Sequence, residues 1–263
     1  MTKFAANLSM LFTELPFLDR FAAAAEAGFG AVEFLFPYEE AAADIRARLD
    51  DTGLELALFN LPPGDWAAGE RGIACLPGRD EEFLAGVHQA LDYAAALGCP
   101  KLHLMAGLGD AADPEARDRY VTRARQAADL VHAAGRTLLI EPINPIGMPG
   151  YFLNSVRLGR ELLEEIDHPG VKLQLDLFHA QITDGDLSRL IAGLGERIGH
   201  VQIASVPDRH EPDGGETNLG YLMERLAEAG YRDWVGCEYV PANGTVAGLG
   251  WLDRVHRSDR GER

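Results

Sequence analysis

Eight short apolar runs recur along this chain of 263 residues, and segments of helical periodicity separate them. The runs cover residues 4–8, 31–36, 54–59, 101–105, 137–141, 171–176, 200–204 and 234–239. The clearest helical segment covers 81–97, where Phe83, Val87 and Leu91 fall on one face. Regular alternation of strands and helices predicts a parallel sheet that is covered by helices. Eight such repeats favour one α/β domain, a closed (β/α)8 TIM barrel over residues 1–263, and leave an open doubly wound sheet as the alternative.

Three of the connections that follow predicted strands are long, at residues 60–79, 142–153 and 205–218. Irregular loops of about 12–15 residues or more are uncommon in compact domains and are often functional. All three leave the carboxyl ends of their strands, so they would crowd the same mouth of a barrel, where barrel enzymes keep their active sites. The alternative interpretation is that the three loops are surface insertions without a function.

The charge of the chain limits the partners that it can have. Acidic residues number 41 against 24 basic ones, which gives a formal net charge of −17. This excess argues against nucleic acid or an anionic membrane as the main partner. No uncharged apolar run approaches the ~18 residues of a membrane span, and no signal peptide is recognisable. Three scattered cysteines without a CxxC pair agree with a cytoplasmic protein. The sequence leaves open whether the protein forms a homo-oligomer.

Oxygen-bearing side chains stand at or near the ends of the last four predicted strands. They are Glu141, Asp176, Gln202 and Glu238, and their spacings of 35, 26 and 36 residues each match about one strand–helix repeat. We therefore expect the four side chains to converge at one mouth. Burying carboxylates together is costly unless a cation balances them. Oxygen ligands favour Mg²⁺ or Mn²⁺ over Zn²⁺, so this set predicts a divalent metal cofactor. Unrelated polar residues at strand ends are the alternative.

Two residues near the predicted metal site suit the binding of a small anionic substrate. His179 follows Asp176 by three residues and could bind a substrate oxygen. Arg209 lies in the long loop after Gln202, and its guanidinium could clamp a carboxylate through two hydrogen bonds. The alternatives are that His179 has a purely structural role and that Arg209 is a solvated charge of the loop.

The loop at residues 60–72 looks like a lid over the predicted mouth, and we refer to it as the lid. Its Trp66 could exclude water from the mouth, unless it is only a packing anchor, and its Arg71 could meet an anionic group. Two more polar residues, Glu33 and His103, lie in the predicted second and fourth strands. We expect both to support the site from behind rather than to touch the substrate.

At these residues the chain resembles the hydroxypyruvate isomerase family, within the broader group of xylose isomerase-like barrels. The resemblance extends from about Phe4 to Val255 and is carried by residues 6–12, 32–38, 60–74, 140–144, 199–204 and 235–239. The lid sequence in 60–74 is its most specific part, whereas carboxylates at strand ends are shared by the wider group. The chain departs from the family pattern at Pro63 and Asp213, two loop positions where substrate fit could change.

The resemblance implies a (β/α)8 barrel and interconversion of hydroxypyruvate with tartronate semialdehyde. Glu141 and Glu238 match the family's proton donor and acceptor. In related sugar epimerases the residues that match Glu141, Asp176, Gln202 and Glu238 also hold the metal, although His is usual where this chain has Gln202. Some close relatives are isomerases of 2-oxo-tetronates, so that substrate is the nearest alternative.

We expect the reaction to move a proton through an enediolate that the metal stabilises, with one glutamate as base and the other as acid. A metal-assisted hydride shift in the same geometry is left open. So are a sugar epimerase and a dehydratase on the same metal site. A non-catalytic sugar-acid binder would need no paired glutamates, and a DNA-repair nuclease would need more histidines and a basic groove.

Overall fold

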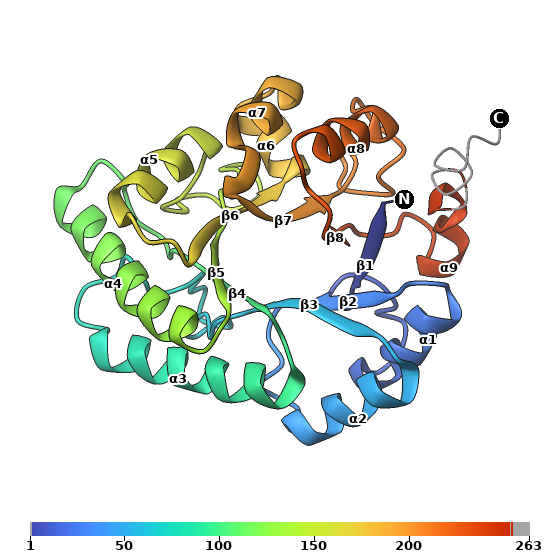
Figure 1. The fold of residues 1–263 in the computed structure, drawn as a ribbon, viewed down its shortest axis with the longest axis horizontal. Helices are drawn as coiled ribbons and strands as arrows, with labels where there is room; N and C mark the ends of the chain where they lie inside the picture. Colours follow the sequence, from blue (N-terminus) through green and yellow to red (C-terminus); the bar gives the residue numbers. More distant parts are fainter. Residues whose placement is uncertain (1, 253, 255–263) are drawn as a thin grey trace.

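The computed structural model describes residues 2–252 and 254, and in this part of the chain eight strands close into a barrel that is ringed by helices (Figure 1). The strands are β1 (Lys3–Asn7), β2 (Ala31–Phe34), β3 (Glu55–Asn60), β4 (Lys101–Leu104), β5 (Thr137–Ile140), β6 (Val171–Asp176), β7 (Ile198–Ile203) and β8 (Trp234–Cys237). The helices are α1 (Arg20–Glu26), α2 (Ala42–Thr52), α3 (Asp80–Leu97), α4 (Pro114–Ala133), α5 (Val156–Ile166), α6 (Leu177–Thr183), α7 (Leu187–Leu194), α8 (Leu219–Glu228) and α9 (Thr245–Gly248), with short 3-10 turns at η1 (Phe17–Asp19) and η2 (Gly195–Arg197).

The strands follow one another around the barrel in chain order, and every neighbouring pair is parallel. Closure comes from β1, which pairs with β2 on one side and with β8 on the other. The predicted (β/α)8 barrel is therefore confirmed, and the open doubly wound sheet is excluded.

Local sequence signals explain where several helices begin and end. Asp113 accepts a hydrogen bond from the backbone N–H of Glu115 and Pro114 occupies the first turn, so α4 begins there. Ser155 caps α5 in the same way, by accepting from the backbone N–H of Leu158. Gly98 has a φ of 71°, a left-handed conformation that suits glycine, and it ends α3.

The structure differs from the prediction at the ends of two strands that carry site residues. β5 ends at Ile140 and β8 at Cys237, so Glu141 and Glu238 are the first residues beyond their strands. Pro142 has no backbone N–H to donate to a neighbouring strand, which accounts for the early end of β5. Between β6 and β7, where the alternation predicts one helical segment, the structure has two helices, α6 and α7.

The long connections at 61–79, 141–155 and 204–218 all leave the carboxyl ends of β3, β5 and β7, as predicted. These ends form one mouth of a closed parallel barrel, so the fold collects the three loops around one opening. Among the described residues, no helix combines the length and the hydropathy that a membrane span requires.

Candidate active site

The four residues predicted at strand ends lie at the mouth of the barrel. Asp176 is the last residue of β6 and pairs in register with Gln202 of β7, while Glu141 and Glu238 directly follow β5 and β8. All four are buried, with exposed fractions between 2% and 7%. Glu141, Gln202 and Glu238 line one small cavity that Glu33 also lines. Their shared role as metal ligands stays a prediction.

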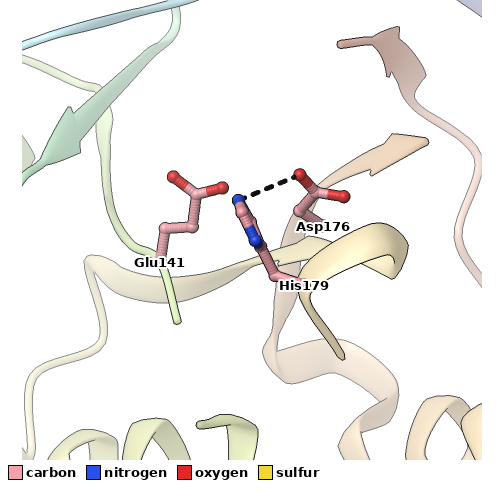
Figure 2. Close-up of side chains that lie close together, drawn as sticks. All are labelled: Glu141, Asp176 and His179. Atoms are coloured by element: carbon pink, nitrogen blue, oxygen red, sulfur yellow. Dashed lines mark ion pairs between the residues drawn. The ribbon is translucent and has the colours of Figure 1, made fainter. Parts of the chain in front are cut away.

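Glu141, Asp176 and His179 form a cluster that could hold a metal ion. One ligand atom from each lies within 4.8 Å of the others, and all three residues are buried. In Figure 2 the His179 ring stands between the two carboxylates, with Nε2 3.5 Å from Oδ2 of Asp176. Carboxylate oxygens are ligands that hard divalent cations prefer, so the residues present are compatible with the metal that the sequence predicts.

The carboxyl groups of this site hold their protons unusually tightly. Burial raises the pKa of Glu141 well above its ordinary value, and repulsion from Glu238 and Asp176 raises it further. Burial also raises the pKa of Glu238, to about 8, although Arg209 opposes the change. The pKa of Asp176 is raised by burial too, again against Arg209. Without a second source of positive charge, Glu238 therefore favours its protonated form near neutral pH.

Arg209 is the cation that the structure brings to these carboxylates. Its Nη2 lies 3.4 Å from Oδ2 of Asp176 and 3.4 Å from Oε1 of Glu238. Its guanidinium also stacks 5.0 Å from the ring centroid of Phe178. Burial alone would lower the pKa of Arg209, but the carboxylates of Glu238, Asp176 and Glu141 raise it overall. Arg209 therefore stays charged at the mouth.

The backbone of Arg209 is held in a strained conformation. Its φ of 55° lies in the left-handed region, which costs of order 1–3 kcal/mol for a residue other than glycine. Hydrogen bonds at both sides keep it there: its N–H donates to Ser205 over 2.9 Å, and its carbonyl accepts from Val240 over 2.8 Å. The loop after β7 is thus built to aim this side chain inward.

His179 lies in the first turn of α6, three residues after Asp176, and is 3% exposed. Burial lowers its pKa well below the ordinary value, and Arg209 lowers it further. Its second ring nitrogen, Nδ1, lies 2.6 Å from Nδ2 of Asn144. Sequence reasoning did not single out Asn144, because the contact depends on the shape of the loop after β5.

Glu33 supports the site from behind, as the sequence predicts. It is fully buried on β2, where its carboxylate accepts from Asn7 at 3.0 Å, from Gln202 at 2.7 Å, and meets Nε2 of His200 at 2.7 Å. A Cβ at Gly236 would lie 2.3–2.5 Å from this carboxylate, so only glycine at that position leaves room for it.

His103 of β4 also lies behind the site, with Nε2 3.6 Å from Oε2 of Glu141. It is 1% exposed, and neither ring nitrogen has a hydrogen-bond partner among the described residues. Burial, with a smaller effect from His200, lowers its pKa to about 3. His103 is therefore a neutral neighbour of Glu141 that leaves the carboxylate's charge unbalanced.

In the lid, the structure joins Trp66 and Arg71 to each other. The Arg71 guanidinium lies 3.9 Å from the centroid of the Trp66 ring and donates to the carbonyls of Trp66 and Glu70. Trp66 is 38% exposed and also packs on Phe36, with 5.1 Å between ring centroids. The side-chain contacts that the structure gives Arg71 are thus within the lid, whereas the side chain of Arg209 contacts the carboxylates. The predicted substrate contacts of Trp66 and Arg71 stay predictions.

The fold and this mouth agree with a known family of barrels. Residues 21–255 match the family described as xylose isomerase-like TIM barrel. The chain therefore belongs to the xylose isomerase-like TIM barrel family.

Full-length relatives narrow the class further. The chain is 55% identical to a 2-oxo-tetronate isomerase of Cupriavidus necator over 96% of this chain and 98% of that one. It is 44% identical to a hydroxypyruvate isomerase of Escherichia coli over 96% and 99% of the two chains. The chain is thus an isomerase, and its resemblance to the hydroxypyruvate isomerase family is confirmed.

Solved structures agree on the architecture. A Brucella melitensis protein described as AP endonuclease, family 2, superposes with a TM-score of 0.94 at 51% identity, over 97% of this chain and 99% of that one. A 3-keto-D-glucoside 4-epimerase of Escherichia coli superposes with a TM-score of 0.77 over 97% and 99% of the two chains. At 21% identity, the epimerase shows the shared fold alone.

Proposed function

We propose that this isomerase converts a small 2-oxo-3-hydroxy acid into its 2-hydroxy-3-oxo isomer. Hydroxypyruvate, which gives tartronate semialdehyde, is the three-carbon case, and 2-oxo-tetronate is the four-carbon case. The two substrates share the reacting carbons and the carboxylate and differ by one hydroxymethyl group on C3. One site chemistry can therefore serve both.

The observation that carries this proposal is the pair of buried glutamates at one mouth, in a chain whose full-length relatives are isomerases. Glu141 and Glu238 line the same small cavity, and repulsion from Glu238 contributes to the raised pKa of Glu141. General acid–base catalysis works best when the pKa of the catalytic group lies near the working pH, and the pKa of Glu238 is about 8. A protein that only binds a sugar acid has no need of such a pair.

In the proposed reaction, one glutamate removes the proton from C3 and leaves an enediolate across C2 and C3. The other glutamate delivers a proton to C2, and the hydroxyl proton on O3 passes to O2, so that a carbonyl forms at C3. The net change moves one hydrogen between carbons and one between oxygens, with no gain or loss of electrons. The lid at 60–72, with Trp66, would keep water from the enediolate.

Glu141, Asp176, Gln202 and Glu238 would hold a divalent metal, for which we propose Mg²⁺ or Mn²⁺. When bound, the ion supplies positive charge that acidifies the C–H bond and stabilises the enediolate. The raised pKa values of the three carboxyl groups support this assignment, because they indicate a site with too little positive charge of its own.

We assign the substrate carboxylate to Arg209 or Arg71. Arg209 is favoured because its guanidinium already lies 3.4 Å from two carboxylates of the site. Arg71 would join only by leaving the face of Trp66. His179, with Nε2 directed into the site, would hold a substrate oxygen.

Sequence identity favours the four-carbon acid over the three-carbon acid. The relatives described as 2-oxo-tetronate isomerases are 46–55% identical to this chain, against 44% for the hydroxypyruvate isomerase of Escherichia coli. We expect turnover of both acids, with the larger kcat/KM for 2-oxo-tetronate.

The cellular location and the partners form a separate part of the proposal. The three buried, free cysteines support a cytoplasmic enzyme, for which we propose a role in carbohydrate metabolism. The acidic net charge supports an enzyme that does not act on nucleic acid.

A panel of substrates tests this proposal. Three- and four-carbon oxo-acids, a ketose and abasic DNA would each be incubated with Mg²⁺ or Mn²⁺, and the products followed by NMR in D₂O. We expect isomers of the oxo-acids that carry solvent deuterium on carbon. Loss of water would instead show a dehydratase, inversion of a ketose an epimerase, strand cleavage a nuclease, and isomers without solvent deuterium a hydride shift.

A further inference from the structure

A turn beside the candidate metal site fixes which nitrogen of His179 carries a proton. The turn begins at Asn144, a residue on the loop after β5 that is 1% exposed. Its side-chain Nδ2 lies 2.6 Å from Nδ1 of His179, and its backbone N–H approaches the same ring nitrogen at 3.4 Å. A backbone N–H can only donate, so one of the two groups facing Nδ1 is a donor however the side-chain amide is turned.

The side-chain amide of Asn144 has only one satisfactory orientation. Its Oδ1 accepts from the backbone N–H of Ile146 at 3.0 Å and from that of Gly147 at 2.7 Å. Turning the amide over would place two donor hydrogens of Nδ2 against two backbone donors. The amide nitrogen must therefore face His179, and it can only donate there.

Because Nδ1 of His179 is an acceptor, a neutral ring must carry its proton on Nε2. Nε2 stands between the carboxylates of Asp176 and Glu141, 3.5 Å from Oδ2 of Asp176 (Figure 2). A ring nitrogen that carries a proton has no lone pair for a metal. The geometry therefore separates His179 from the carboxylates with which it is clustered: they can ligate, whereas His179 donates.

We propose that Asn144 is a positioning residue that holds His179 as the Nε2–H tautomer, so that His179 is a hydrogen-bond donor in the site and not a metal ligand. The tautomer follows from contacts within the protein alone. The further step, that Nε2–H donates to a substrate oxygen that becomes negative in the enediolate, rests on the proposed function. A fixed donor at that oxygen stabilises the charge that develops on it.

NMR of the substrate-free enzyme labelled with ¹⁵N-histidine reads the tautomer directly. The His179 signals are assigned by their loss in His179→Gln, among the 8 histidines of the chain. We expect Nε2 to show the shift of a protonated nitrogen and Nδ1 that of an unprotonated one. A protonated Nδ1 in the folded wild-type enzyme overturns the inference.

Asn144→Asp is the sharpest variant, because it keeps the turn and reverses the contact with His179. One carboxylate oxygen can still accept from Ile146 and Gly147, while the other faces Nδ1 as an acceptor. We expect the proton to appear on Nδ1 and kcat to fall on the order of 10²-fold, with a smaller change in KM. Asn144→Ala, which adds no acceptor and keeps the backbone N–H toward Nδ1, should weaken the preference for the Nε2–H tautomer without reversing it. Unchanged His200 signals show that each variant is folded, and an unchanged tautomer in folded Asn144→Asp contradicts the role of Asn144.

Mn²⁺ binding, followed by electron paramagnetic resonance, tests the second half of the inference. His179→Ala should bind Mn²⁺ as tightly as the wild type, whereas Asp176→Asn should bind it much more weakly. Equal weakening in the two variants would make His179 a ligand. Neither readout needs a substrate, so an enzyme with the Nε2–H tautomer that turns over no oxo-acid overturns the proposed function and leaves this inference standing.

Discussion

Gln202 on β7 donates its side-chain amide to Glu33 on β2 across 2.7 Å in the buried interior of the barrel. Because the amide nitrogen of Gln202 faces Glu33, the amide oxygen points the other way, to where it accepts from Gln174 at 2.6 Å. Glu33 and Gln174 together thus fix the orientation of the Gln202 side-chain amide.

Replacing Glu33 with Gln should destabilise the protein. If the new amide oxygen keeps the bonds from Asn7 and Gln202, the NH2 group faces Nε2 of His200 and the contact of 2.7 Å is lost while that nitrogen carries a proton; a buried unsatisfied group costs about 1–3 kcal/mol. We expect the free energy of unfolding, measured with urea, to fall by that amount. Glu39→Gln, at an exposed position, is the control and should change it by less than about 0.5 kcal/mol. Equal stability of the two variants would show that the Glu33 bonds contribute little.

Gly236→Ala should also destabilise the protein, because its Cβ would lie 2.3–2.5 Å from the Glu33 carboxylate. Overpacking of this kind costs about 1–3 kcal/mol. Gly193 in α7 offers the matched control, since a Cβ there meets nothing within 4 Å. Gly193→Ala should stabilise the helix by about 0.5–1 kcal/mol. Thermal unfolding of both variants measures the contrast, and a neutral Gly236→Ala would mean that the carboxylate can move aside.

Arg209→Ala should mainly raise KM for an acid substrate. A charge-assisted hydrogen bond contributes about 1.5–3 kcal/mol, so we expect an increase of about 10–100-fold. Arg71→Ala should have the smaller effect, because Arg71 is held on Trp66 within the lid. Steady-state kinetics with an oxo-acid and with a neutral sugar separates the two arginines. If neither variant affects acids more than neutral sugars, the carboxylate binds elsewhere.

Metal binding should release protons. The pKa of Glu238 is about 8 in the metal-free protein, so this carboxyl group is mostly protonated at pH 7 and must ionise to bind a cation. Calorimetry of Mn²⁺ binding at pH 7 in buffers of different ionisation enthalpy should report the release of about one proton or more on binding. The release should decline as the pH rises above about 8, and Glu238→Gln should remove its share. Binding heats that do not depend on the buffer would contradict the raised pKa.

The same shift gives the metal-free protein a defined pH dependence. Folded Glu238 holds its proton more tightly than the unfolded chain, so its stabilising contribution is complete below the ordinary pKa of 4.5 and is lost as the pH rises through about 8. The stability of wild type relative to Glu238→Gln should therefore fall between these limits, which urea unfolding at several pH values can follow.

The sequence predicted the positions of Glu141, Asp176, Gln202 and Glu238 because a parallel barrel gathers the carboxyl ends of its strands at one mouth. Strand periodicity and one-repeat spacing were sufficient for that purpose. They also placed Arg209 in a loop at this mouth. Its contact with two carboxylates depends on the left-handed backbone conformation of Arg209, which the sequence does not predict.

The contact between Asn144 and His179 is a second feature that the sequence could not predict. It joins a loop after β5 to a helix after β6, and it exists because Asn144 folds back on its own backbone. Such a contact depends on loop conformation rather than on periodicity. The space beside Gly236 that the Glu33 carboxylate fills could not be predicted from the sequence either. It depends on the register of β7 with β8 and on the approach of β2.

The most direct test of the account is the kcat of metal-loaded Glu238→Gln and Glu141→Gln, measured by NMR with 2-oxo-tetronate in D₂O. Glutamine keeps the shape and a carbonyl oxygen but cannot accept the proton. Positioned acid–base catalysis contributes on the order of 10²–10⁴-fold, so each variant should lose at least about 10²-fold in kcat while it keeps its fold and some metal affinity. Near-native turnover by either folded, metal-loaded variant would contradict the account and leave that glutamate outside the proton transfer.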